Sequence, residues 1–175
     1  MQVLSRQRGV SLIEVLMAVL IFSVSLIGMA GLLMMATRSN QAAYLRTQVA
    51  FLAGNMADRM RANPAAVWDG SYNQSVPFTG TQDCQTARCT PDQLATADFA
   101  EWGSQLAAFL PSPTAQITCD NSKIGFTPSS TQVSMRPPYG GTCNMKISWY
   151  ERQTGDESIN TANQFQQTFA WTFQP

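Results

Sequence analysis

The sequence contains no histidine, and few of its residues are charged. Charged residues make up 13% of the 175 residues, and eleven Lys and Arg balance eleven Asp and Glu. Without histidine the chain lacks the usual neutral-pH base and the commonest zinc ligand, which excludes His-based catalytic triads and His-containing zinc sites. A net charge of zero leaves no excess positive field to attract nucleic acid. We therefore expect a protein that is not an enzyme, uses no cofactor or metal, and does not bind nucleic acid.

The apolar residues are concentrated near the amino terminus. Residues 1–9 are polar and include Arg6 and Arg8 without an acid. Between residues 10 and 36 the only charged residue is Glu14. The uncharged stretch 15–37 would be roughly 35 Å long as a helix, which is enough to cross a bilayer once. The basic flank predicts that residues 1–9 stay on the cytoplasmic side. The apolar run is too long for an ordinary cleaved secretory signal.

Glu14 is the residue that a simple membrane anchor leaves unexplained. A carboxylate in a spanning helix costs on the order of 2.5 to 3.5 kcal/mol at the bilayer centre and less near an end, so it needs a compensating partner. Cleavage after Gly9 would create an amine at Val10, one helical turn from Glu14 and at the positive end of the helix dipole. The amine of a neighbouring copy offers the same pairing.

A basic leader that ends in Gly9, followed by residues 10–14 (Val-Ser-Leu-Ile-Glu) and an apolar helix, resembles the type III signal of type IV prepilins. The resemblance implies cleavage after Gly9 by a membrane prepilin peptidase, N-methylation of Val10, and assembly guided by Glu14. Two positions depart from the common pattern: Val10 stands where Phe or Met is usual, and Gly31 where many major pilins have proline. Gly28 and Gly31 are expected to supply the helix flexibility, since each glycine costs a helix about 1 kcal/mol relative to Ala.

The helical period continues beyond the apolar run. Apolar residues recur at spacings of three and four on a single stripe, which comprises Leu45, Val49, Leu52, Met56 and Met60. The spacing predicts an amphipathic helix whose stripe, methionines included, packs into a core. Asn63-Pro64 predicts where this helix ends. One helix over 11–62 would be about 78 Å long.

Residues 64–175 have a different composition, rich in Ser, Thr, Gln, Asn, Gly and Pro. Residues 90–93 (Thr-Pro-Asp-Gln) predict the capped start of a short helix that ends before Pro111. On this helix Asp98 and Glu101 are expected on a solvated face. Alternating apolar residues predict antiparallel strands over 145–150 and 169–173, joined by the polar segment 154–163, and a weaker strand over 115–119.

Together these elements predict an α+β fold, in which a small antiparallel sheet lies on the soluble half of the long helix. The predicted divisions of the chain are a leader (1–9), a transmembrane and assembly helix (10–37), an amphipathic continuation of the helix (38–63) and a globular head (64–175).

All four cysteines follow the membrane segment, at Cys84, Cys89, Cys119 and Cys143. Export would place them where disulfides persist. Of three possible pairings we favour Cys84 with Cys89 and Cys119 with Cys143, because each closes a segment without long regular structure, and crossed pairings stay open. A four-cysteine zinc site is disfavoured by the missing C-x-x-C pairs. Between the last two cysteines, Tyr139 suggests either a recognition tip or, more simply, an ordinary surface loop.

Residues 44–48 and 56–64, together with Cys89, Leu94, Trp102 and Leu106, resemble the PilV family of minor pilins, also called type IV pilus modification proteins. The resemblance is good over residues 1–64, moderate over 89–111 and thin elsewhere. It implies the type IV pilin fold and a low-abundance pilin that joins other minor pilins in a complex priming assembly and capping the fibre tip. Adhesion and twitching motility would depend on that complex.

The same resemblance implies further partners and a location. The partners would be the prepilin peptidase, the major pilin, the inner-membrane assembly machinery and the lipid bilayer. The head is expected in the periplasm before assembly and on the surface pilus afterwards. Two alternatives remain open at this point: a minor pseudopilin of a type II secretion system, and a membrane-anchored periplasmic enzyme or binding module.

Overall fold

The computed structural model describes residues 9–78, 80–152 and 164–175. The chain divides into two compact units, Met1–Gln41 and Ala42–Pro175. Helix α1 (Leu12–Ala62) belongs to both units, and its bounds match the helix that the sequence predicts over 11–62. Residues 1–8 of the predicted leader and the predicted connecting segment 154–163 lie outside the described residues.

The first unit contains the apolar part of α1. Over its most apolar window the helix has a mean hydropathy of 2.5, and none of that window is buried inside the protein. It is the one helix among those described that is long and apolar enough to cross a membrane. The hydroxyls of Ser23 and Ser25 donate to the carbonyls of Val19 and Ile21 at 2.7 and 2.8 Å. These bonds satisfy both polar side chains within the helix itself, which suits apolar surroundings.

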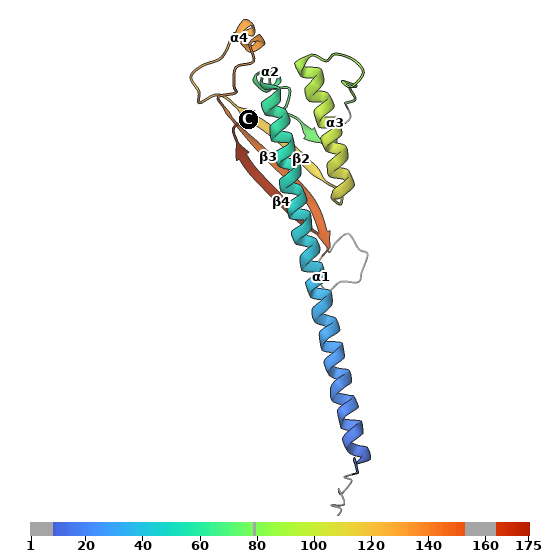
Figure 1. Ribbon diagram of the computed structural model, residues 1–175. Coiled ribbons are helices and arrows are strands. Elements are labelled where there is room, and N and C mark those ends of the chain that lie inside the picture. The colour runs from blue at the N-terminus through green and yellow to red at the C-terminus, as the bar shows by residue number, and fades with distance from the viewer. Residues whose placement is uncertain (1–8, 79, 153–163) are drawn as a thin grey trace, which may run out of the picture. The chain divides into compact units, whose positions relative to one another are not determined.

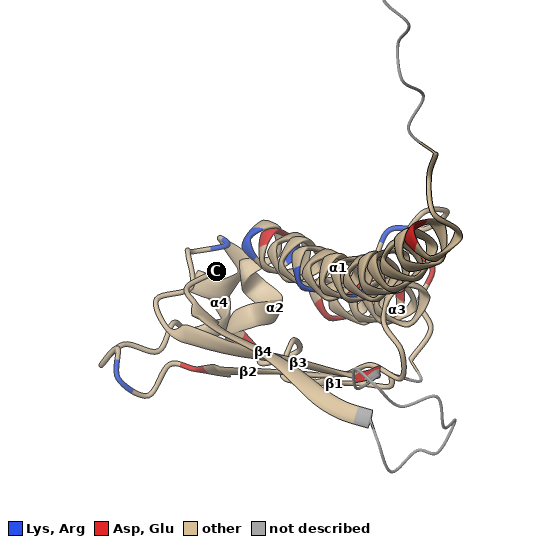
Figure 2. Ribbon diagram, turned by 90° about the horizontal axis from the view of Figure 1, so that it is seen from below, with Lys and Arg blue, Asp and Glu red and all other residues tan. Residues whose placement is uncertain are grey.

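The second unit is built on a four-stranded sheet (Figure 1). Its strands are β1 (Ser75–Val76), β2 (Thr114–Asp120), β3 (Thr142–Arg152) and β4 (Gln164–Phe173), all antiparallel and in the order β1-β2-β3-β4. The predicted strands and the α+β fold class are confirmed, and β1 was not predicted. The helices of this unit lie on one face of the sheet (Figure 2).

Helix α3 (Pro91–Phe109) begins at the predicted capping box. Thr90 accepts a hydrogen bond from the Gln93 N–H, and the Gln93 side chain accepts one from the Thr90 N–H. These reciprocal bonds satisfy two donors that a helix start leaves unpaired. Two five-residue helices, α2 (Pro64–Trp68) and α4 (Ser130–Ser134), were not predicted.

The core of the second unit lies between the helices and the sheet. The predicted stripe of α1 faces it, with Leu45 half-buried and Val49, Leu52, Met56 and Met60 buried. The indole N–H of Trp102 in α3 donates to the carbonyl of Leu52 at 3.0 Å, which fixes α3 against α1. From the sheet, alternate residues of β2 and β3 complete the core: Ala115, Ile117, Cys143, Met145, Ile147 and Trp149.

The two disulfides join Cys84 to Cys89 and Cys119 to Cys143, the pairing that the sequence favours. The reason given for the second pair was incomplete. Cys119 and Cys143 lie directly opposite each other on β2 and β3, so the bridge links two paired strands in addition to closing the largely irregular segment 121–141.

Tyr139, proposed from sequence as a recognition tip or part of a surface loop, is buried with 3% of its surface exposed. Its ring packs edge-on against Trp68, with the ring centroids 4.8 Å apart. The Trp68 indole donates to the carbonyl of Pro137 at 3.1 Å. These contacts fasten the 137–139 segment to α2, so the recognition-tip hypothesis is wrong for the Tyr139 side chain, whereas Pro138 and Gly140 on either side of it are exposed and belong to the predicted surface loop.

Candidate processing and assembly site

The residues that carry the prepilin resemblance lie at the start of α1. The N–H groups of Glu14 and Val15 donate to the carbonyl of Ser11 at 3.0 and 3.3 Å, so Ser11 caps the first turn with its backbone. Glu14 is thus in the first turn, where unpaired N–H groups give the helix its positive end. The carboxylate is stabilised there by the helix dipole before any partner arrives.

Gly9 and Val10 precede the helix and have no regular secondary structure. Both are exposed, and Val10 keeps 70% of its surface accessible. A peptide bond outside a helix and open to solvent is accessible to a peptidase without unfolding of α1. The geometry therefore suits cleavage between these two residues, which stays a prediction.

Gly28 and Gly31 lie inside the continuous helix α1. A Cβ atom added at either position would meet nothing within 4 Å in this chain. Crowding within the chain therefore does not require glycine at these positions. Their assignment to helix flexibility remains a prediction from helix propensity.

The apolar part of α1 exposes a continuous hydrophobic surface. Its large exposed side chains are Leu12, Ile13, Val15, Leu16, Met17, Val19, Leu20, Ile21, Phe22, Val24, Leu26, Ile27, Met29, Leu32, Leu33, Met34 and Met35. An apolar surface of this size on a protein is covered by lipid or by other protein. It surrounds the helix on all sides, so many neighbours can share it.

The second unit holds a polar cluster that sequence reasoning missed. The Arg59 guanidinium donates to Asp98 at 3.0 Å and to Glu101 at 2.9 Å. The hydroxyl of Tyr72 donates to Asp98 at 2.6 Å, and the Asn63 amide donates to that hydroxyl at 3.3 Å. Glu101 is exposed as expected, but Asp98 is 7% exposed, so its predicted place on a solvated face is wrong.

This cluster joins the end of α1 to α3 and shifts the affinity of its groups for protons. Burial, and then the hydrogen bond to Asp98, raise the pKa of Tyr72. The hydrogen bond from Arg59 lowers the pKa of Glu101. Arg59 and Tyr72 therefore stay protonated and hold the Asp98 carboxylate in place. A signal for its burial was present in the spacing, since Asp98 follows Ala95 by three residues and precedes Trp102 by four, on the buried side of α3.

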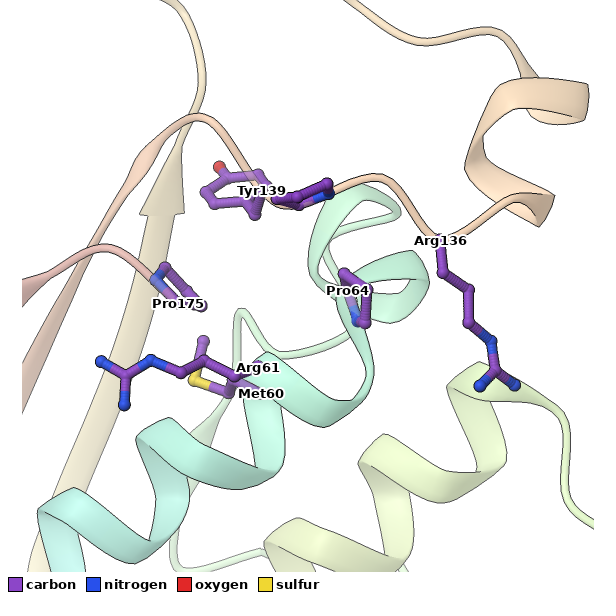
Figure 3. Close-up of a pocket in the computed structure, with 7 residues that line it drawn as sticks. Met60, Arg61, Pro64, Arg136, Tyr139 and Pro175 are labelled. Atoms are coloured by element: carbon purple, nitrogen blue, oxygen red, sulfur yellow. The ribbon is translucent and has the colours of Figure 1, made fainter.

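A cavity of about 300 Å³ lies in the second unit, near the end of α1 (Figure 3). Its walls are largely rings and a thioether, and its lining residues are Met60, Arg61, Pro64, Arg136, Pro138, Tyr139 and Pro175. Both guanidinium groups extend away from the space between Tyr139, Pro64 and Pro175. Arg61 is paired with Asp58 at 2.7 Å. The cavity offers apolar ring surfaces, and its geometry does not indicate a ligand.

Two family models match adjacent segments of the chain. Residues 4–30 match the prokaryotic N-terminal methylation motif, and residues 31–100 match a family described as type IV pilin Tt1218. No curated protein and no solved structure matches the chain. The first match contains Gly9, Val10, Glu14 and Gly28, and the second begins at Gly31 and includes Arg59 and Asp98.

The matches agree with the geometry at the start of α1. A prepilin methylation motif implies processing by a prepilin peptidase and assembly with other pilins. The apolar helix that follows the motif suits a pilin that is anchored in the inner membrane and later assembled into a pilus. Pilins are structural proteins, not an enzyme family. Over residues 4–100 the chain therefore matches first a prokaryotic N-terminal methylation motif and then a type IV pilin family.

Proposed function

We propose that this chain is a minor pilin, which joins other minor pilins in a complex that primes pilus assembly and sits at the fibre tip. Pilus biogenesis, adhesion and twitching motility would depend on that complex. The observation that carries the pilin part is Glu14 in the first turn of an exposed apolar helix, directly after Gly9 and Val10. The minor-pilin part rests on the resemblance of residues 44–48 and 56–64 to the PilV family.

The structure gives the 56–64 segment a physical role that agrees with this resemblance. Met56 and Met60 fill the core, and Arg59 bonds Asp98 and Glu101. The Asn63 amide also donates to the carbonyl of Pro91 at 2.8 Å, at the start of α3. The segment thus fixes the carboxyl-terminal end of α1 to α3. Because these contacts hold α1 and α3 together, the orientation of the head would follow the orientation of this end of α1 when subunits pack in a fibre.

The mechanism is electrostatic and mechanical. Prepilin peptidase removes residues 1–9, and methylation follows at the new amine of Val10. Before assembly the helix lies in the inner membrane with the head in the periplasm. Extraction transfers apolar surface from lipid to the helices of other minor pilins and the major pilin. Glu14 then leaves a bilayer in which its charge costs up to about 3 kcal/mol and meets the amine of a neighbouring subunit.

The first test of the assembly role is Glu14→Gln in the full chain, expressed in piliated cells. The variant keeps the shape of the side chain and loses its charge. We expect the variant to be processed and membrane-bound, but its amount in sheared surface fibres should fall roughly tenfold, because the neutral side chain cannot form the ion pair with the neighbouring amine. A tenfold reduction corresponds to about 1.4 kcal/mol. Asp69→Asn, at an exposed carboxylate of the head outside the Arg59 cluster, serves as the matched control. Wild-type incorporation of Glu14→Gln would count against the proposal and favour a simple membrane-anchored module.

A deletion strain separates the pilus from a secretion system. The proposal predicts the chain in sheared surface fibres and a loss of twitching motility in the deletion, with exported enzymes unaffected. Loss of exported enzymes with normal motility would instead identify a minor pseudopilin of a type II secretion system.

A further inference from the structure

The outer edge of β4 is the longest strand edge of the sheet that has no neighbour. In the strand order β1-β2-β3-β4 this strand is terminal, and its ten residues all pair with β3. No other described residue makes a backbone hydrogen bond to it. Half of its backbone N–H and C=O groups therefore point outward along the edge, where they form a template for another strand.

The sequence of this edge carries none of the usual devices that prevent pairing. Residues 164–173 (Gln-Phe-Gln-Gln-Thr-Phe-Ala-Trp-Thr-Phe) include no charge, no proline and no glycine. Natural edge strands are generally shortened, charged or interrupted by proline. The opposite edge of the same sheet follows that rule, because β1 has two residues and is followed by Pro77. The two edges differ in the way expected if only β4 has a partner.

The core face of β4 carries a row of aromatic side chains that is interrupted by Gln167, a hydrogen-bond partner of Arg46, and is incompletely covered. Phe173 is 7% exposed, Phe169 and Trp171 are half-buried, and Phe165 is 52% exposed. The rings of Trp171 and Phe173 stack with their centroids 4.6 Å apart. The row therefore becomes more open toward the start of the strand. One additional strand with apolar residues on the same face would cover it.

Pairing of β4 with β4 between two copies of this chain does not meet these requirements, and head-to-tail pairing would offer the ten residues of β4 only the two residues of β1. In an antiparallel β4–β4 pair, the two copies are related by a two-fold axis normal to the sheet. This rotation reverses the direction of residues 42–62 of α1 in the second copy relative to the first. Two copies anchored in the same membrane by their amino-terminal helices need the same direction. A parallel pair turns the second sheet over, so that the aromatic rows lie on opposite faces and neither covers the other.

We propose that the outer edge of β4 receives a β-strand from a different pilin subunit, one with uncharged apolar residues facing the aromatic row. This inference deepens the proposed function, on which it rests, by assigning the head its contact in a minor-pilin complex. Recognition is by strand addition: the backbone hydrogen bonds supply the attraction, and the aromatic row selects the partner's side chains.

Two threonines provide a matched test. Thr172 on β4 and Thr118 on β2 are both exposed and lie on either side of Asn144 of β3, on the same face of the sheet. A photo-crosslinking amino acid is placed at one or the other position in the full chain, in cells that assemble pili. We expect Thr172, and not Thr118, to give an adduct with a different prepilin-motif subunit, with the cross-linked peptide mapping to a strand of that subunit.

Lysine variants at the same positions supply an independent readout. Thr172→Lys puts a charge on the edge strand, and we expect roughly tenfold less co-purification of the cross-linked pilin. Thr118→Lys lies at the opposite edge of the sheet, where β1 no longer pairs with β2, and should leave co-purification unchanged. The inference is overturned if both positions give equal adducts or if Thr172 gives no adduct. It is also overturned if the adduct joins only residues of this chain, whether within one copy or between two copies.

Processing at Gly9 and incorporation into fibres are measured in the same cells. If the wild-type chain is not processed at Gly9 or does not enter fibres, the proposed function itself is contradicted. If processing and incorporation are normal but Thr172 gives no adduct, only the strand addition is contradicted.

Discussion

The hydroxyl of Tyr72 donates a 2.6 Å hydrogen bond to Oδ2 of Asp98, a carboxylate whose other oxygen accepts from Arg59 at 3.0 Å. Arg59 lies in the last turn of α1, Asp98 in the middle of α3, and Tyr72 between α2 and β1. One buried carboxylate therefore joins three segments that are separated by 39 and 26 residues along the chain. This contact fixes the carboxyl-terminal end of α1 to the middle of α3.

Replacing Asp98 tests this joint. Asp98→Ala leaves the Tyr72 hydroxyl without its acceptor and Arg59 with Glu101 alone, so we expect the free energy of unfolding to fall by about 2–4 kcal/mol. Glu101→Ala removes an exposed partner of the same guanidinium and should cost at most about 1 kcal/mol. Urea unfolding of the full chain in detergent micelles, followed by tryptophan fluorescence, measures both. Equal losses for the two variants would show that Asp98 has no special role.

The raised pKa of Tyr72 predicts a loss of stability in alkali. Its pKa is higher in the folded than in the unfolded chain, where it lies near 10. The stabilisation is therefore complete below about pH 10 and is lost as the pH rises above that value. Tyr72→Phe should cost about 1–2 kcal/mol at pH 7 and weaken the alkaline loss. Burial also raises the pKa of Tyr139, so Tyr139→Phe is measured alongside. An unchanged pH profile in Tyr72→Phe would contradict the assignment.

The two disulfides are expected to contribute unequally. Cys119 and Cys143 are separated by 24 residues, and Cys84 and Cys89 by five. Loop entropy predicts that replacing both cysteines by alanine costs roughly 3.5 kcal/mol for the first pair and roughly 2 kcal/mol for the second. The first loss should be larger still, because Cys143 is buried in the core. Urea midpoints of the two double variants provide the comparison, and the reverse order would refute it.

Gly141 is a position where close approach requires glycine. A Cβ atom there would collide with the carbonyl oxygen of Asp120 and with the ring of Tyr139. Gly141→Ala should therefore reduce the free energy of unfolding by about 1–3 kcal/mol. At the neighbouring Gly140 a Cβ would lie 3.2 Å from the flexible end of the Ile124 side chain, so Gly140→Ala should have a smaller effect. Thermal unfolding of the two variants tests the difference.

Elements with a long periodic or capped pattern were predictable from the sequence. Helix α1 repeats its apolar stripe over many turns, α3 opens on a capping box, and β3 and β4 alternate over several residues. Helices α2 and α4 and strand β1 are too short for a period to be recognised. The burial of Asp98 was missed because its partners, Arg59 and Tyr72, are distant in sequence and only the fold brings them together.

The processing site stays a prediction, and that prediction rests on local sequence alone. Gly9, Val10 and Glu14 lie within six consecutive residues, and the family model that matches residues 4–30 covers all three. The aromatic row of β4 was also predictable as a strand face. Its incomplete cover was not, because the strand order of the sheet decides which strand lies at an edge.

The intact mass of the non-reduced chain, purified from membranes of cells that contain prepilin peptidase, tests the central claim most directly. The account predicts the mass of residues 10–175, with one methyl group on the Val10 amine and four hydrogens fewer for the two disulfides. A mass that retains residues 1–9 would contradict processing at Gly9 and remove the amine that Glu14 is expected to meet.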